Sequence, residues 1–176
     1  MAAFGQFLPT DIEVIMKSYS FIMDRIHWFL SHLVSILLGL LVVIVSLQIA
    51  GRLLPFLPYM LWTEEIARFL LTWLVFIGGA VGVKEHSHFL VDIFPTVKSK
   101  VLQVTWDLFI SLGMVGVASI FAYRGFKYAM VLVYDTSDIA QVPMIWVGAA
   151  IPLFGILSLL FLVEEILKTI ANAREA

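Results

Sequence analysis

The sequence IHWFLSHLVSILLGLLVVIVSLQIAG, residues 26–51, decides the fold of this chain. It lies between Arg25 and Arg52 and contains no Asp, Glu, Lys or Arg. A helix needs about 20 mostly apolar residues to cross the hydrocarbon core of a bilayer. The segment therefore predicts a transmembrane helix over about 26–50.

The rest of the chain repeats this pattern. Apolar runs bounded by charged residues predict further spans over about 66–83, 101–123 and 139–163. The composition is 61% hydrophobic and only 14% charged, whereas soluble domains carry about 25% charged residues. We expect one all-α membrane domain over residues 1–176, a four-transmembrane-helix bundle with both termini on the same side.

An amphipathic segment precedes the first span. Thr10-Asp11-Ile12-Glu13 reads as a capping box at the start of a helix, and the residues that follow place apolar side chains on one helical face. We expect an N-terminal amphipathic helix over 10–25 that lies in the membrane interface. The alternative is a plain extension of the first transmembrane helix.

The distribution of basic residues predicts the orientation, because cytoplasmic loops are enriched in Lys and Arg. With the N-terminus inside, seven of the 11 cations lie on the cytoplasmic side: Lys17, Arg25, Lys84, Lys98, Lys100, Lys168 and Arg174. The outer side then carries Arg52, Arg68, Arg124 and Lys127. We expect both termini in the cytoplasm.

Ionisable residues avoid the centres of all four expected spans. Ion-coupled transporters commonly keep such a group within the membrane, so the pattern disfavours an autonomous four-helix transporter. Glu64 and Glu65 precede Arg68 at a spacing that predicts an ion pair on one helical face. Glu164 and Lys168 predict a similar pair, which we expect in a solvated turn.

Small residues indicate places where helices approach closely. Gly78 and Gly82 form a GxxxG in the second expected span, while Gly148 and Gly155 lie in the fourth. Such residues permit van der Waals contact between helices in lipid. The contact is either within this bundle or with another subunit.

The four histidines allow two interpretations. His32 with His86 or His88 is suited to hold a haem in a membrane-anchor cytochrome; otherwise the histidines lie at the interface. Cysteine is absent, and no phosphate-binding glycine loop or zinc signature occurs. We expect no enzymatic activity, no resident cofactor and no binding to nucleic acid.

The order of several motifs resembles the small, four-helix Q-type membrane subunit of tripartite ATP-independent periplasmic (TRAP) transporters. The similarity rests on Trp62-Thr-Glu-Glu-Ile-Ala-Arg68, Trp73, Gly78, His88-Phe-Leu-Val-Asp92, Val142-Pro143, Trp146 and Ile151-Pro152. It extends over about residues 20–165.

The resemblance implies a non-catalytic permease subunit in the inner membrane of a bacterium. Such transporters use the sodium gradient to import small organic acids, such as C4-dicarboxylates or sialic acid. The large membrane subunit carries sodium and substrate, a periplasmic protein delivers the substrate, and the small subunit supports the scaffold. We expect a subunit interface formed by Trp62, Glu65, Arg68, Trp73, Gly78, Gly82, Pro143, Trp146 and Pro152. We expect His88 and Asp92 to form a cytoplasmic interfacial motif, and membrane lipid to contact the subunit.

Overall fold

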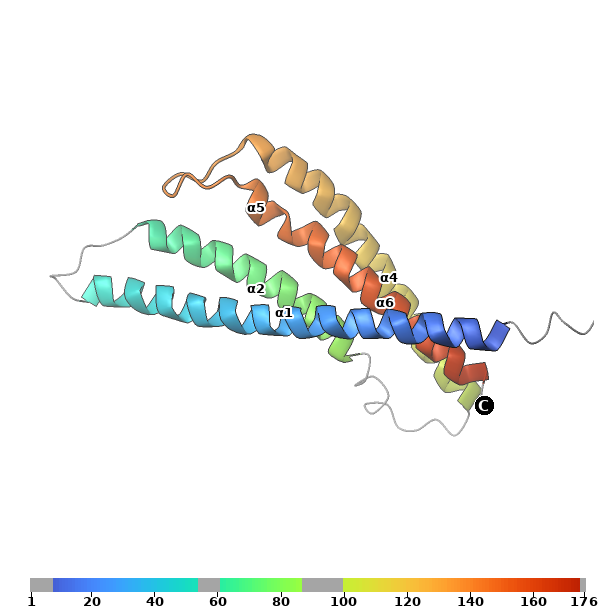
Figure 1. The fold of residues 1–176 in the computed structure, drawn as a ribbon. Coiled ribbons are helices and arrows are strands. Elements are labelled where there is room, and N and C mark those ends of the chain that lie inside the picture. Colours follow the sequence, from blue (N-terminus) through green and yellow to red (C-terminus); the bar gives the residue numbers. More distant parts are fainter. Residues whose placement is uncertain (1–7, 54–60, 87–99, 175–176) are drawn as a thin grey trace, which may run out of the picture.

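The structure is a computed structural model that describes residues 8–53, 61–86 and 100–174. The elements in chain order are α1 (Leu8–Leu53), α2 (Trp62–His86), α4 (Lys100–Val131), the 3-10 turn η1 (Leu132–Tyr134), α5 (Ile145–Gly148) and α6 (Ala150–Arg174). Figure 1 shows the long helices and the loop between α4 and α5.

Within residues 8–53, 61–86 and 100–174, four stretches are long and apolar enough to cross a membrane. They are Lys17–Leu53, Trp62–Glu85, Phe109–Tyr134 and Ile145–Thr169, with mean hydropathies between 1.5 and 2.7. A helix satisfies its backbone hydrogen bonds internally, which hydrocarbon requires because it offers no other partners. The prediction of an all-α protein with four transmembrane helices is confirmed.

The first three long helices extend beyond the spans expected from the sequence. A charged residue marks the limit of the hydrocarbon, but a helix continues to bond its own backbone in water. Residues 10–25 belong to the same unbroken helix as 26–50. The 46 residues of α1 extend about 69 Å at 1.5 Å per residue, more than twice a hydrocarbon core of about 30 Å. The interfacial position of 10–25 stays a prediction.

The last span begins at Ile145, later than the 139 expected, because the preceding residues form a hairpin-like loop. The Ser137 amide donates to the Val142 carbonyl at 2.9 Å, and the Met144 amide donates to the Asp135 carbonyl at 2.9 Å. Gln141 turns the chain with a φ of 53°. We call residues 135–144 the hairpin, and the part of the bundle that carries it the hairpin end.

Glycines bring α4 and α6 together. A Cβ added at Gly155 would lie 2.7 Å from Ala122 Cα and 2.8 Å from the Ala118 carbonyl oxygen. A Cβ at Gly148 would lie 3.2 Å from Ala129 Cα. Neither position has room for a side chain, so both expected close approaches of the last span occur within this chain.

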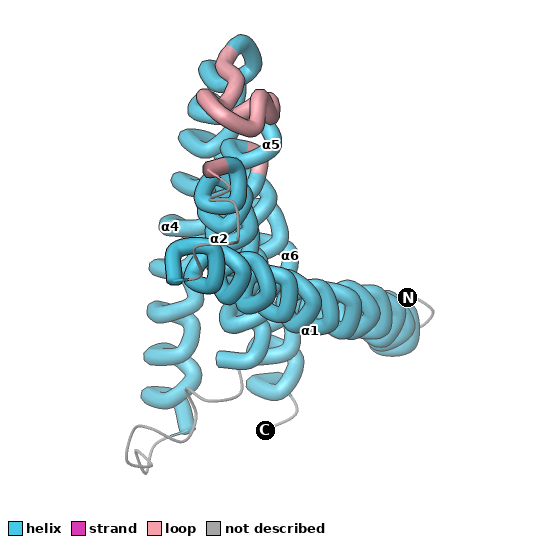
Figure 2. The backbone as a smooth tube through the Cα atoms, turned by 90° about the vertical axis from the view of Figure 1, so that its left-hand side faces the viewer, coloured by secondary structure: helices cyan, strands magenta, loops and turns pink. Residues whose placement is uncertain are grey.

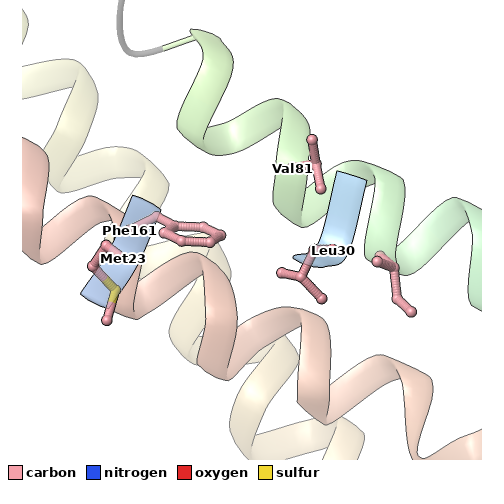
Figure 3. Packing of buried hydrophobic residues seen from close by; sticks show 5 residues of the cluster. Met23, Leu30, Val81 and Phe161 are labelled. Carbon is pink, nitrogen blue, oxygen red and sulfur yellow. The ribbon is translucent and has the colours of Figure 1, made fainter. Parts of the chain in front are cut away.

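A second packing region joins α1, α2 and α6. The buried residues of this cluster are Met23 and Leu30 of α1, Ile77 and Val81 of α2, and Phe161 of α6 (Figure 3). Figure 2 shows α1 running at a marked angle to α4 and α6. The core is therefore formed where α1 and α2 cross α6, and not along the full length of α1.

Replacing Gly155 with Ala is expected to destabilise the protein, because the new methyl group forces the α4 and α6 backbones apart. Overpacking of this kind costs about 1–3 kcal/mol. The measurement is the midpoint of thermal unfolding in detergent. Gly116→Ala is the matched control, since nothing lies within 4 Å of its Cβ position and Ala favours a helix by about 0.5–1 kcal/mol over Gly. Equal midpoints for the two variants would contradict the packing.

Candidate functional site

Glu65 connects the first turns of α2 to the hairpin. The amide of Ala140 donates to Glu65 Oε2 at 2.7 Å, and the amide of Ile139 donates to both carboxylate oxygens at 3.2 and 3.3 Å. In Figure 1 the loop between α4 and α5 extends toward the start of α2. A carboxylate that accepts several backbone N–H groups makes strong, directional bonds. Glu65 therefore ties the two halves of the chain together at the hairpin end.

Glu64 and Arg68 form the ion pair that the sequence predicted. Arg68 Nη2 donates to Glu64 Oε1 at 3.1 Å, and Arg52 Nη2 lies 3.9 Å from Glu64 Oε2. The Arg68 side chain is 68% exposed, so it remains accessible to a further partner. The neighbouring carboxylates thus have separate roles: Glu64 pairs with arginines, and Glu65 holds the hairpin.

The three tryptophans of the expected interface differ in exposure. Trp62 is 48% exposed and Trp146 is 65% exposed. Trp73 is partly buried against the cluster formed by α1, α2 and α6. The structure therefore leaves Trp62 and Trp146 accessible near the hairpin end, while Trp73 contacts its own chain.

The two prolines also differ. Pro143 is exposed in the hairpin, where it forms an isolated β-bridge with Thr136. Pro152 is buried in the first turn of α6, where its missing N–H is not needed by the helix. A Cβ at Gly125 of α4 would lie 2.8 Å from the Pro152 nitrogen, so Pro152 serves the contact between α4 and α6.

The GxxxG of α2 faces open space in this chain. Among the residues that the structure describes, nothing lies within 4 Å of a Cβ placed at Gly78 or Gly82. The two glycines therefore do not serve a contact with another described helix, in contrast to Gly148 and Gly155. Their face is available to another molecule.

A charge cluster lies at the end of the bundle opposite the hairpin; Lys84 and Glu164 at its centre are shielded, whereas Asp24 and Lys168 are 67% and 45% exposed. Lys84 Nζ lies 2.6 Å from Asp24 Oδ1 and 3.4 Å from Glu164 Oε2, and Lys168 Nζ lies 2.6 Å from Glu164 Oε1. The ion pair between Glu164 and Lys168 is confirmed. The expected solvated turn is wrong, since the Glu164 side chain is only 5% exposed.

The sequence analysis missed the burial of Glu164 because it ended the last span at 163. In the structure α6 continues to Arg174, so Glu164 is flanked by α1 and α2. A usable signal existed in the sequence. Lys84 and Glu164 close two spans on the same side of the membrane, which places opposite charges at one level.

The described histidines make local hydrogen bonds. His27 Nε2 lies 3.3 Å from Glu85 Oε1, and His32 Nδ1 donates to the Trp28 carbonyl at 2.8 Å. Within the part of the chain that the structure describes, no group of three or more His, Asp or Glu side chains is arranged to hold a metal ion.

Three predicted residues lie outside what the structure describes. His88 and Asp92 belong to the undescribed residues 87–99, and the side chain of His86 is likewise not described. The expected interfacial motif therefore stays a prediction.

The four apolar helices of the described residues, each long enough to cross a membrane, define a multi-pass membrane protein. A family model with the description "Tripartite ATP-independent periplasmic transporters, DctQ component" matches residues 41–172. The chain belongs to this family and is a small membrane component of a TRAP transporter. The curated proteins searched contain no match to it.

Substituting Glu65 with Gln is expected to loosen the hairpin, because the amides of Ile139 and Ala140 lose a charged acceptor. The measurement is amide hydrogen exchange of residues 138–140, which should become faster. Glu64→Gln is the matched control, since it removes the neighbouring carboxylate but leaves the hairpin bonds in place. Unchanged exchange in Glu65→Gln would show that the hairpin holds itself without α2.

Proposed function

We propose that this chain is the non-catalytic scaffold subunit of a sodium-driven TRAP transporter that imports small organic acids. It binds the large membrane subunit through the open face of α2 and the exposed residues at the hairpin end. The observation that carries this proposal is the open GxxxG of Gly78 and Gly82, on a chain that belongs to the small-component family.

Lipid alone is a poor explanation for the exposed face of α2. Small residues on a transmembrane helix bring no gain against fluid acyl chains, but they let a second helix approach closely. Arg68 lies about 9 Å along α2 from Trp62, at 1.5 Å per residue, and is exposed. Its guanidinium pairs with Glu64 at 3.1 Å, and its exposed part remains accessible to a second acceptor. A protein partner accounts for the small residues and can supply that acceptor.

The positions of the charged residues indicate which tasks belong to this chain and which to the large subunit. The ionisable residues described in α2 lie near its ends, with Glu64, Glu65 and Arg68 in the first turns and Lys84 and Glu85 in the last. The buried carboxylate of Glu164 in α6 is already paired with Lys84 and Lys168. Sodium coupling and recognition of an organic acid are therefore assigned to the large subunit. C4-dicarboxylates and sialic acid remain the substrate classes that the family resemblance implies.

We infer that both termini lie in the cytoplasm of the bacterial cell. The bias of Lys and Arg supports this orientation. The hairpin then faces the periplasm, where Tyr134 and Trp146 are exposed and accessible to the periplasmic substrate-binding protein.

Labelling of a single cysteine tests this orientation. The chain has no native cysteine, so Asp135→Cys introduces the only thiol, at an exposed position of the hairpin. A membrane-impermeant maleimide added to intact spheroplasts is expected to label it. If the thiol is labelled only after the membrane is opened, the orientation is the opposite of the one proposed.

Affinity purification in mild detergent, followed by mass spectrometry, tests the subunit assignment. The chain is expected to recover a much larger polytopic protein in about equal amount. Recovery of the chain alone would contradict the proposed function.

The same purification tests the face of α2. Gly78→Leu is expected to lower the recovered large subunit about tenfold, equivalent to ~1.4 kcal/mol of binding. The thermal stability of the chain itself should change little, because the position is open. Gly116→Leu on α4 is equally open and serves as the control. If the Gly78→Leu chain still recovers the large subunit in full, this face of α2 is not part of the subunit interface.

A further inference from the structure

The charge cluster of Asp24, Lys84, Glu164 and Lys168 is not explained by the proposed interface. Its members alternate in sign, and each of the two central groups contacts two opposite charges. Lys84 is 11% exposed and lies between Asp24 and Glu164, while Glu164 lies between Lys84 and Lys168. The cluster joins α1, α2 and α6 in one network.

The network coincides with the place where α1 crosses α6. The Tyr19 hydroxyl of α1 donates to the Leu160 carbonyl of α6 at 2.9 Å. Met23 of α1 and Phe161 of α6 belong to one buried cluster, and Lys84 Nζ lies 5.4 Å from the Phe161 ring centroid. Figure 3 shows Met23 and Phe161 close together at this crossing.

Apolar packing at this crossing brings Met23 and Leu30 of α1 together with Phe161 of α6. Polar contacts add a fixed direction to this packing. Lys84 links the two helices: its ammonium lies 2.6 Å from Asp24 of α1 and 3.4 Å from Glu164 of α6. A changed crossing angle would draw Lys84 away from one of these two carboxylates, and losing a contact costs most at the pair with Glu164, where both side chains are shielded from solvent. The cluster therefore penalises any change in the angle between α1 and α6.

Because α1 is long, a small change in its angle at Asp24 moves its far end by a large distance. The helix continues from Asp24 to Leu53 with exposed apolar residues such as Val42, Val43 and Leu47. Residue 49 lies about 37 Å along the helix from Asp24, so a rotation of roughly 10° moves it by about 6 Å.

We propose that Lys84 and Glu164 are positioning residues that set the angle at which α1 and α2 cross α6. They thereby direct the exposed face of α1 toward the large membrane subunit. The direction of α1 toward the large subunit rests on the proposed function, whereas the crossing angle does not.

Distance measurement between spin labels tests the angle. Labels at Ile49→Cys on α1 and Ile156→Cys on α6 occupy exposed positions in the full chain in nanodiscs. The parent is expected to give a narrow distance distribution. Lys84→Met, which keeps the length of the side chain without its charge, is expected to shift or broaden it by about 5 Å, as a rotation of under 10° would do on such a helix.

Two variants serve as controls for this measurement. Lys84→Arg restores the charge and should return the narrow distribution. Lys127→Met removes an exposed lysine whose ammonium lies 4.6 Å from the Tyr123 ring centroid, and it should have no effect. An unchanged distribution in Lys84→Met overturns the proposal. If circular dichroism shows that Lys84→Met does not fold, the distance distribution is measured in Glu164→Gln instead. An unchanged distribution in that variant overturns the proposal.

Recovery of the large subunit separates the two statements. A broadened distribution with reduced recovery supports both, and a broadened distribution with full recovery overturns the link to assembly. If the unsubstituted chain recovers no large membrane protein, the proposed function fails. The distance measurement on the chain alone still decides whether Lys84 sets the crossing.

Discussion

Close approach of helix backbones is the constraint on which this fold depends. Apolar side chains gain little by leaving lipid for a protein interior, so association depends on contact and not on burial. Gly155 permits that contact between α4 and α6 by bringing Ala122 against the α6 backbone. Where the chain has glycine but no helix opposite it, as at Gly78 and Gly82, the same physics favours a second molecule.

Polar contacts hold the two ends of the bundle, where the glycine contacts between α4 and α6 do not reach. At one end Glu65 accepts hydrogen bonds from the hairpin, and at the other Lys84 and Glu164 form a buried ion pair. Both contacts join residues far apart in the sequence: Glu65 of α2 to the hairpin, and Lys84 of α2 to Glu164 of α6. The hydrophobic centre of the bundle is therefore held between two polar ends.

The number of spans was predictable because hydrocarbon thickness determines how long an apolar run must be, as residues 26–51 illustrate. Glu64 and Arg68 were predictable because they lie one helical turn apart. The partner of Glu65 was not, since the hairpin depends on a positive φ at Gln141 and on the position of α4. Burial of Glu164 was missed for a related reason: no local pattern reports that α1 and α2 cover it.

The order of the charge cluster along the chain has a consequence for biogenesis. Asp24 is synthesised first, Lys84 next and Glu164 last. A shielded lysine without a counter-charge is costly, but Lys84 has Asp24 of the preceding helix available as a partner before the last helix is made. The final helix then brings the second carboxylate together with Lys168, which keeps the growing cluster near neutrality. The first two helices can thus reside in the membrane as a tolerable intermediate until translation is complete.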